Sequence, residues 1–406
     1  MRDVDLFQLA LGLEEPWQVV SSSFDAGARR LELRLDFAKG ARFECPECRR
    51  SGCPVHDTSE KTWRHLDFFE HQAYLTARVP RVVCPEHGTL QVRVPWARPE
   101  SGFTLLFEAL VMALVSEMPV KAVADLIGEH DTRVWRIVHH YVDRARAHQD
   151  LGDVTKVGAD ETSFRRGQDY VTVFADLDER RVVFATPGRD ADTYKRFAAD
   201  LDAHGASASQ VEQVSQDMSE AFLTGALTHL PNAEITFDRF HVKAKLSEAI
   251  DKVRREEARE QRELLKNTRY LWLRRPQHLT AKQRDWLDEL LCQPLRTARA
   301  YELMLRFDDA YTLSREQAEP YLRAWCQAAR DTDLEPLHDF ADMVEEYWLG
   351  ITEWWTSKVS NGLLEGLNSL IQAAKRRARG YRSTRNYIAM IYLTAGKLDI
   401  AVTHSK

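Results

Sequence analysis

The stretch that decides the fold begins at residues 154–187, VTKVGADETSFRRGQDYVTVFADLDERRVVFATP, and continues with VEQVSQD at residues 211–217 and AEITFD at residues 233–238. β-Branched and aromatic residues form short runs bounded by Asp, Gly, Arg and Pro, a pattern typical of strands. Segments with helical spacing lie between the later runs. We therefore predict strands over residues 154–164, 170–176, 181–186, 211–215 and 233–237, and helices over residues 192–204 and 219–230.

Three meandering strands followed by helix, strand, helix and strand is the order of the ribonuclease H-like fold. In open sheets of this kind, chemistry sits at strand ends near a change in strand order. Asp160 lies on the first predicted strand, and Asp217 follows the fourth. Phosphodiester cleavage needs an activated water and a stabilised leaving oxygen, which two cations about 4 Å apart can supply. Because hard cations prefer carboxylates, we expect Asp160, Asp217 and a third acid to bind two Mg²⁺ or Mn²⁺ ions.

The third acid should come from a late helix that crosses the sheet. Glu365 fits, in the segment SNGLLEGLN at residues 360–368. Asn361 could cap this helix, and Glu365 and Asn368 would share one of its faces. Glu161 should point to the opposite face of the strand from Asp160, in a supporting role. The Glu365 helix continues into a basic run that we expect to lie along DNA phosphates: Lys375, Arg376, Arg377 and Arg379.

A second aspartate, Asp238, also follows a predicted strand, in the pattern Asp238-Arg-Phe-His241. Neighbouring strands lie about 4.8 Å apart. On the predicted fold, Asp217 is one strand away from Asp160 and Asp238 is two. A shared ion needs carboxylate oxygens within a few ångströms of each other, which favours Asp217 as the metal ligand. We therefore expect Asp238 and His241 to support the site.

The N-terminal part carries metal-ligand spacing. Cys45-Pro-Glu-Cys48 and Cys84-Pro-Glu-His87 are two knuckles of the kind that can complete a tetrahedral zinc site. A closed site with four protein ligands is structural and supplies folding energy. Cys53 and His56 have the same CxxH spacing, so they could replace one knuckle or hold a second ion.

Residues 103–148 read as helices. An apolar helix over residues 103–116 is followed by Val120, Val123, Ala124 and Ile127 on one helical face, and Gly128 ends that helix. Arg133 and Arg136 then lie near the start of the next helix. This pattern resembles a helix-turn-helix whose second helix reads DNA. The alternative is an ordinary helical hairpin.

The composition of the chain limits the class of protein to which it can belong. The chain has 406 residues, 44% hydrophobic and 29% charged, with a formal net charge of −6. These values fit a multidomain globular protein. We find no run long enough to span a membrane and no secretory signal, so we expect a cytoplasmic protein with no membrane partner. An alternating stretch at residues 30–37 predicts a half-buried strand.

Together these features predict a multidomain α/β protein. Its parts are an N-terminal strand-containing segment (1–40), a zinc-binding module (41–97), a helix-turn-helix domain (98–150), the first part of a ribonuclease H-like core (151–241), an all-α insertion (242–350), and a core return helix with a basic C-terminal segment (351–406).

From about Phe43 to Leu398, the chain resembles the ISL-three insertion-sequence transposases of bacteria. The resemblance rests on the CPEC and CPEH knuckles, TWRHLDF, GADETSF, SQDMSEAF, PNAEITFDRFHV and SNGLLEGLNSLIQAAKRRARGYRSTRNY. It implies a zinc-binding N-terminus, a helix-turn-helix, and a DDE core whose catalytic acids are Asp160, Asp217 and Glu365. His87 departs from the family, in which many relatives carry a second cysteine.

We therefore expect a DNA transposase that binds terminal inverted repeats, hydrolyses a strand at the element end and joins the freed 3′-hydroxyl to target DNA. It should work as a homodimer or higher oligomer on DNA. The alternative is a DNA-binding regulator with an inactive DDE core. A ribonuclease or junction resolvase would have no evident need for the zinc module and helix-turn-helix.

Overall fold

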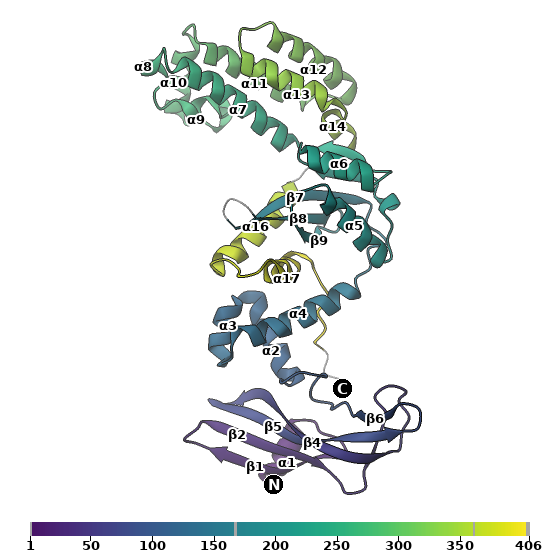
Figure 1. Cartoon of the computed structure of the whole chain (residues 1–406). Helices are drawn as coiled ribbons and strands as arrows, with labels where there is room; N and C mark the ends of the chain where they lie inside the picture. The colour runs from purple at the N-terminus through teal and green to yellow at the C-terminus, as the bar shows by residue number, and fades with distance from the viewer. Residues whose placement is uncertain (1, 166–168, 360–361, 403–406) are drawn as a thin grey trace. The chain divides into compact units, whose positions relative to one another are not determined.

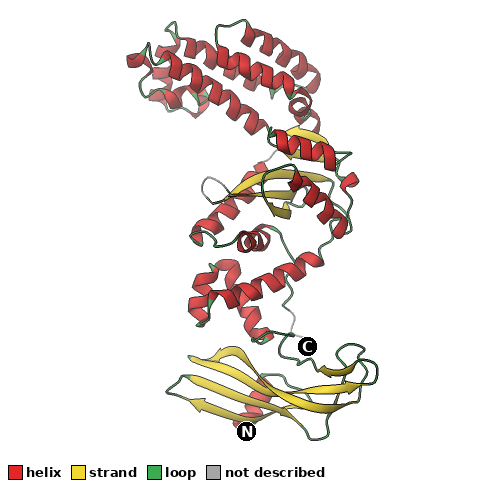
Figure 2. Ribbon diagram, in the orientation of Figure 1, coloured by secondary structure: helices red, strands yellow, loops and turns green. Residues whose placement is uncertain are grey.

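The structure, a computed structural model, describes residues 2–165, 169–359 and 362–402 (Figure 1). The chain forms two compact units, Met1–Ala145 with Asp399–Lys406, and Arg146–Leu398. Along the chain, strands are concentrated in the first part of each unit, and helices make up the rest (Figure 2). Among the helices in the described ranges, none has the length and apolar character needed to cross a membrane.

A six-stranded sheet forms the first part of the N-terminal unit. Its strand order is β1-β2-β5-β4-β3, and β6 pairs with β5. The bounds are α1 Asp3–Ala10, β1 Trp17–Asp25, β2 Arg30–Phe37, β3 Arg42–Phe43, β4 Cys53–Phe68, β5 His71–Cys84 and β6 Gly88–Gln91. The alternation predicted in β2 is present, because Leu31, Leu33 and Leu35 are buried. Since β2 pairs with β5, the predicted domain boundary after residue 40 falls inside one sheet.

Three helices follow this sheet: α2 Leu105–Glu117, α3 Val120–Ile127 and α4 Asp131–Ala147. Gly128 ends α3 with a φ of 69°, a left-handed conformation that glycine adopts without steric cost. Val123 and Ala124 are fully buried, so α3 packs through the apolar face that its sequence predicts. Glu108 of α2 is also fully buried, where it accepts hydrogen bonds from Arg98 and Tyr141.

The second unit is built on a five-stranded sheet with the order β11-β10-β7-β8-β9. Its elements are β7 Lys156–Arg165, β8 Asp169–Asp176, β9 Arg181–Pro187, α5 Asp192–Ala203, η1 Ala208–Gln210, β10 Gln213–Gln216, α6 Glu220–His229 and β11 Glu234–Phe237. The predicted order of strands and helices is confirmed. β7, β8 and β9 form an antiparallel meander, whereas β10 and β11 run parallel to β7. Ser215 is level with Gly158, so Asp217 and Asp160 each follow two residues later on neighbouring strands.

A helical insertion follows β11. Its elements are α7 Arg239–Glu257, α8 Arg262–Leu265, α9 Arg269–Trp272, η2 Pro276–His278, α10 Ala281–Leu291, α11 Arg296–Ala310, α12 Arg315–Arg330, α13 Glu335–Glu346, α14 Trp348–Thr352 and α15 Trp354–Ser357. These helices share one hydrophobic core, which buries Trp272, Trp354 and Trp355. Buried Glu257 accepts hydrogen bonds from the backbone amides of Arg296 and Thr297, at 2.7 and 2.8 Å, and so satisfies the first turn of α11.

The chain then returns to the sheet through α16 Gly362–Arg377 and α17 Thr384–Ala395. The predicted cap Asn361 lies outside the described residues. α16 crosses β7 at Gly158, where an added Cβ would lie 2.5 Å from Cδ1 of Leu364 and 2.9 Å from Cδ2 of Leu177. The absence of a side chain at Gly158 thus lets the Glu365 helix lie against the Asp160 strand.

We expect Gly158→Ala to lower the free energy of unfolding by about 1–3 kcal/mol, because the new methyl group overpacks this crossing. Leu364→Ala should cost about 2–5 kcal/mol by leaving a cavity. The double variant should lose less than the sum, since the shortened side chain makes room for the new methyl. Denaturant unfolding measures all three.

The matched control is Gly366→Ala on α16, where an added Cβ meets no atom within 4 Å. That variant should be neutral or slightly stabilising, because alanine favours helix. Strictly additive losses for Gly158→Ala and Leu364→Ala would contradict the predicted contact.

Candidate zinc cluster and carboxylate site

Four predicted ligands come together in the N-terminal unit. The ligand atoms of Cys45, Cys48, Cys84 and His87 all lie within 4.8 Å of one another. Cys48 Sγ is 3.7 Å from Cys84 Sγ, and His87 Nδ1 is 3.8 Å from Cys45 Sγ and 3.6 Å from Cys84 Sγ. Zinc–sulfur bonds of about 2.3 Å in a tetrahedron place sulfurs about 3.8 Å apart. The cluster therefore has the dimensions of a zinc site.

Local backbone structure explains this convergence. Around the first knuckle, the amide of Arg49 donates to the carbonyl of Cys45, and the amide of Cys45 donates to the carbonyl of Arg50. At the second, Cys84 ends β5 and turns into β6, which brings His87 back beside it. The hydrogen bond from His87 lowers the pKa of Cys84 to about 6. This favours the thiolate, the form that binds metal.

The alternative pair Cys53 and His56 is not gathered into the cluster. Buried Cys53 directs its thiol to the carbonyl of Arg50, at 3.5 Å. His56 is paired instead with Asp57, at 3.1 Å between Nδ1 and Oδ2. Among the residues with described positions, the set of four is the one group of His, Cys, Asp or Glu side chains with metal-ligand geometry.

In the second unit, Asp160 is the most constrained of the predicted acids. Its Oδ1 accepts from the backbone amide of Glu161 at 2.7 Å, and its Oδ2 accepts from Nδ2 of Asn368 at 2.5 Å. Burial raises the pKa of Asp160, and the charge of Asp217 raises it further, whereas a charged His241 lowers it. Asp217 and His241 are thus close enough to Asp160 to act on its charge.

Asp217 and Asp238 differ in their surroundings. Asp217 is half-buried, and its Oδ1 accepts from the amide of Ser219 at 3.1 Å. Asp238 is buried; its Oδ1 accepts from the amide of Phe240 at 3.2 Å, which caps α7. The amide of Asp238 donates to the carbonyl of Gln216 at 3.0 Å, so Asp238 braces the end of β10 where Asp217 begins.

The second carboxylate oxygen of Asp238 differs from the first. Its Oδ2 is buried and has no hydrogen-bond partner among the described residues. Such an oxygen normally binds a water, a proton donor or a metal ion. Asp238 is therefore both a helix cap and the competing candidate for a metal ligand.

Glu365 lies in the first turn of α16 with an exposed side chain. In the described part of the structure, its carboxylate and those of Asp160 and Asp217 do not form a compact three-acid cluster. The link between α16 and the aspartates is Asn368, one turn beyond Glu365, through its bond to Asp160. Gln372, one turn further, donates to Thr162 Oγ1 at 2.7 Å.

Glu161 is nearer to the site than its place on the strand predicts. Burial raises its pKa to about 7, and the charge of Asp217 contributes to the increase, with a smaller contribution from Asp160. Glu161 and Asp160 are thus both affected by the charge of Asp217, an effect that bound cations would offset.

The predicted DNA-contact residues fall into two groups. Arg133 and Lys375 already have partners within the protein: Arg133 contacts Glu129 at 2.5 Å and stacks over Phe103, and Lys375 donates to the carbonyl of Ser163. The exposed members are Arg136, Arg376, Arg377 and Arg379. These four exposed arginines can bind phosphates without first breaking one of the contacts within the protein described above.

Sequence reasoning missed the roles of three side chains. It placed Asn368 beside Glu365 but did not predict its bond to Asp160, and it did not single out Gln372. Tyr194, fully buried, donates a hydrogen bond to Gln216, the residue before Asp217. The helical spacing of Asn368 and Gln372 on the face of α16 toward β7 could have revealed the first two.

Comparison with known proteins gives matches in each part of the chain. The catalytic-domain family of ISL3 transposases, described as Transposase, matches residues 157–391. The helix-turn-helix domain of transposase family ISL3 matches residues 92–142, and the zinc-finger of transposase IS204/IS1001/IS1096/IS1165 matches residues 41–87.

Full-length relatives agree with these matches. The transposase for insertion sequence element IS1557 of Mycobacterium tuberculosis is 29% identical and aligns with 97% of this chain and 96% of its own length. The transposase for insertion sequence element IS1001 of Bordetella parapertussis is also 29% identical, over 86% of this chain and 87% of its own. The chain belongs to the ISL3 family of DDE transposases, which pair a zinc-finger module and a helix-turn-helix with a catalytic domain for DNA cleavage and strand transfer.

Proposed function

We propose that this transposase cuts and joins DNA with two Mg²⁺ or Mn²⁺ ions held by Asp160, Asp217 and Glu365, on a ribonuclease H-like core. The observation that carries the proposal is the parallel register of β10 with β7, which pairs Ser215 with Gly158, two residues before Asp217 and Asp160 respectively. The strand order β11-β10-β7-β8-β9, with an antiparallel meander beside two parallel strands, supports the fold assignment. Glu365 would complete the set when DNA and cations bind.

The residues around these acids have separable tasks. Asn368 and the amide of Glu161 orient the Asp160 carboxylate, and Asp238 and Gln216 hold the end of β10. When bound, the cations would activate the attacking water or 3′-hydroxyl and stabilise the leaving oxygen. His241, whose charge acts on Asp160, would offset negative charge at the site between cation-binding events.

DNA recognition is assigned to the N-terminal parts. We propose that the helix-turn-helix reads the terminal inverted repeats through the start of α4, with Arg133 and Arg136, while zinc at Cys45, Cys48, Cys84 and His87 stabilises the neighbouring sheet. The C-terminal run of Lys375, Arg376, Arg377 and Arg379 would bind the phosphates of element and target DNA. We propose further that the protein acts in the cytoplasm, as a homodimer or higher oligomer on DNA. A DNA-binding regulator with a silent core is less well supported, because all three acids are present.

We expect one zinc ion per chain. Cys48→Ala should lose the metal and destabilise the N-terminal unit, because three ligands cannot close the tetrahedron. Elemental analysis and thermal unfolding of the purified chain measure both effects. Cys53→Ala is the control and should keep its zinc. Full zinc in Cys48→Ala together with zinc loss in Cys53→Ala would assign the ion to the other knuckle.

For the acids, we expect Asp217→Asn to abolish strand cleavage, because a metal ligand loses its charge. Binding to element ends should persist or tighten slightly, since one charge that repels phosphate is gone. Asp238→Asn should keep partial cleavage and act mainly on folding, because an amide oxygen can still cap α7. Gel assays of cleavage and binding, with Mn²⁺ as the cofactor, separate the two variants. Normal cleavage by Asp217→Asn with none by Asp238→Asn would reverse their assignment.

The two basic groups should behave differently. Alanine at Arg133 and Arg136 should reduce discrimination between element ends and unrelated DNA by about 10-fold or more, as expected for residues that read bases. Alanine at Arg376, Arg377 and Arg379 should weaken all DNA about equally and reduce the salt dependence of binding. Competition binding at several salt concentrations distinguishes these outcomes. Equal loss of discrimination from both sets would contradict the division of roles.

A further inference from the structure

Three arginines converge on one carboxylate in the helical insertion. Arg254 Nη2 lies 2.8 Å from Asp251 Oδ1, and the Nε atoms of Arg255 and Arg269 each lie 3.5 Å from Asp251 Oδ2. Where the structure describes the chain, the ion pairs of these arginines all lead to Asp251. One negative charge therefore faces three positive charges, which leaves a local excess of two.

The excess positive charge is exposed to solvent. The side chain of Asp251 is only 12% exposed, whereas those of Arg255 and Arg269 are 65% and 55% exposed. Asp251 thus holds the arginine stems in place while much of each guanidinium remains open to solvent. Guanidinium groups fixed in this way are suited to phosphate, which they can bind with two parallel hydrogen bonds.

Both arginines line a groove of about 650 Å³ along α7. From α7, the groove is lined by Phe240 at one end, by the small residues Ala244 and Ser247 and the acids Glu248 and Asp251 in the middle, and by Arg255 at the other end; Arg269 of α9 adds to the basic end. The spacing of these α7 residues places them on one face of the helix. Because the side chains of Ala244 and Ser247 are small, they leave room for a ligand to lie against the helix.

The groove begins beside the carboxylate site. Phe240 is 59% exposed and comes two residues after Asp238, which accepts its amide hydrogen bond and whose own amide donates to the carbonyl of Gln216, the residue before Asp217. From Phe240 to Arg255 the helix rises about 22 Å at about 1.5 Å per residue.

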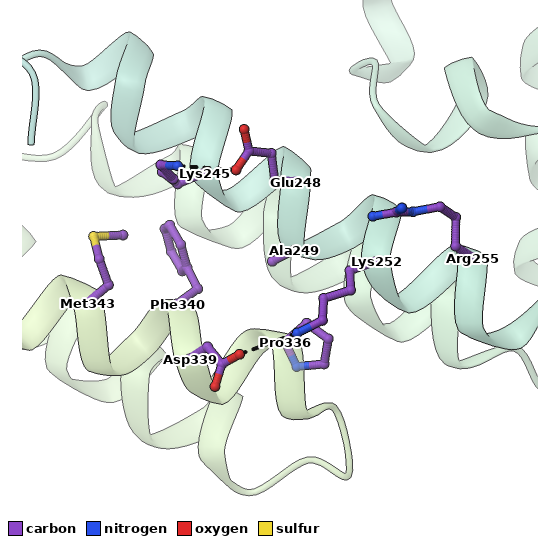
Figure 3. Close-up of a pocket in the computed structure, with 9 residues that line it drawn as sticks. All are labelled: Lys245, Glu248, Ala249, Lys252, Arg255, Pro336, Asp339, Phe340 and Met343. Carbon is purple, nitrogen blue, oxygen red and sulfur yellow. Dashed lines mark hydrogen bonds and ion pairs between the residues drawn. The ribbon is translucent and has the colours of Figure 1, made fainter.

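The face of α7 toward α13 is different (Figure 3). There Lys252 pairs with Asp339 at 3.5 Å and Lys245 with Glu248 at 3.3 Å, so each cation has its own acid, while Arg255 is joined to none of the residues drawn. Arg255 also lies at the end of the pocket on this face, so its exposed guanidinium is shared by both sides of the helix. Arg269 lines the α7 groove and not this pocket.

We propose that this α7 groove binds one strand of the DNA that runs away from the scissile phosphate, with a base stacked on Phe240 and phosphates on Arg255 and Arg269. The proposal rests on the proposed function, because it takes the carboxylates at the start of α7 as the place of cleavage. An aromatic ring followed by basic side chains is the combination that binds single strands without reading their sequence. Lys243, which also lines the groove, is engaged with Asp308 at 2.7 Å and adds little free charge.

The test uses the full chain, a fluorescein-labelled 20-nucleotide single strand of mixed sequence, and no added divalent metal, so that binding is measured without cleavage. Anisotropy titrations at several salt concentrations give the affinity and its salt slope. The double variant Arg255→Ala, Arg269→Ala should bind at least tenfold more weakly, with a slope reduced by about 1.4, because each lost phosphate contact changes a single-strand slope by about 0.7.

Lys252→Ala is the matched control, since it removes a cation from the same helix that is already neutralised by Asp339. Its affinity and salt slope should stay near those of the unmodified chain. At the other end, Phe240→Leu should weaken binding by about tenfold, and Phe240→Trp should retain it, because stacking needs a ring. Circular dichroism of each variant verifies that the insertion remains folded.

Equal effects of Lys252→Ala and the arginine variant would overturn the proposal, as would unchanged binding in the arginine variant. An arginine effect without any Phe240 effect would indicate a site for a free phosphate ion and would also overturn it. Plasmid cleavage with Mn²⁺ is a separate measurement. If Asp217→Asn still cuts while the groove variants lose binding, the catalytic assignment fails and only the groove as a DNA site remains.

Discussion

The contact between α16 and β7 is the constraint on which the catalytic half depends. The two elements are separated by about 200 residues, and each carries part of the proposed site. Gly158 permits their close approach, Leu364 fills the crossing, and Asn368 joins the helix to Asp160. The helical insertion leaves the sheet after β11, and the chain then returns to a crossing that side-chain packing fixes. The fold can therefore accommodate a long insertion between these two points.

The two proposed metal sites differ in how far the protein forms them by itself. Thiolate and imidazole ligands on tight turns reach tetrahedral spacing through backbone hydrogen bonds alone. The carboxylates are in a different situation: burial is the main cause of the raised pKa of Glu161 and of Asp160, and the charge of Asp217 raises both further. Local turns gather the cysteine and histidine side chains, whereas bound cations would offset the charge of the carboxylates.

Much of the fold could be predicted because local patterns agreed with the tertiary structure. The strands and helices from β7 to β11 have apolar runs of the right period, and their order was predicted with ends within a few residues. The clustering of Cys45, Cys48, Cys84 and His87 could be predicted, because knuckle spacing is itself a local geometry. The N-terminal boundary was harder, since the pairing of β2 with β5 joins residues about 40 apart and leaves no mark on composition. The partners of Arg133 and Lys375 were equally hidden, because sequence reveals a charge but not the acid or carbonyl that faces it.

The cysteine knuckles also tie metal binding to redox state. The sulfurs of Cys48 and Cys84 lie 3.7 Å apart, and the hydrogen bond from His87 keeps Cys84 largely as thiolate at neutral pH. A thiolate is the nucleophile in disulfide exchange, so a cluster stripped of zinc holds an activated sulfur next to a second thiol. Bound zinc would therefore protect these cysteines from oxidation as well as join two turns. Once the cysteines were oxidised, zinc could return only after a reductant restored the thiols, and the N-terminal fold would then depend on the reducing capacity of its surroundings.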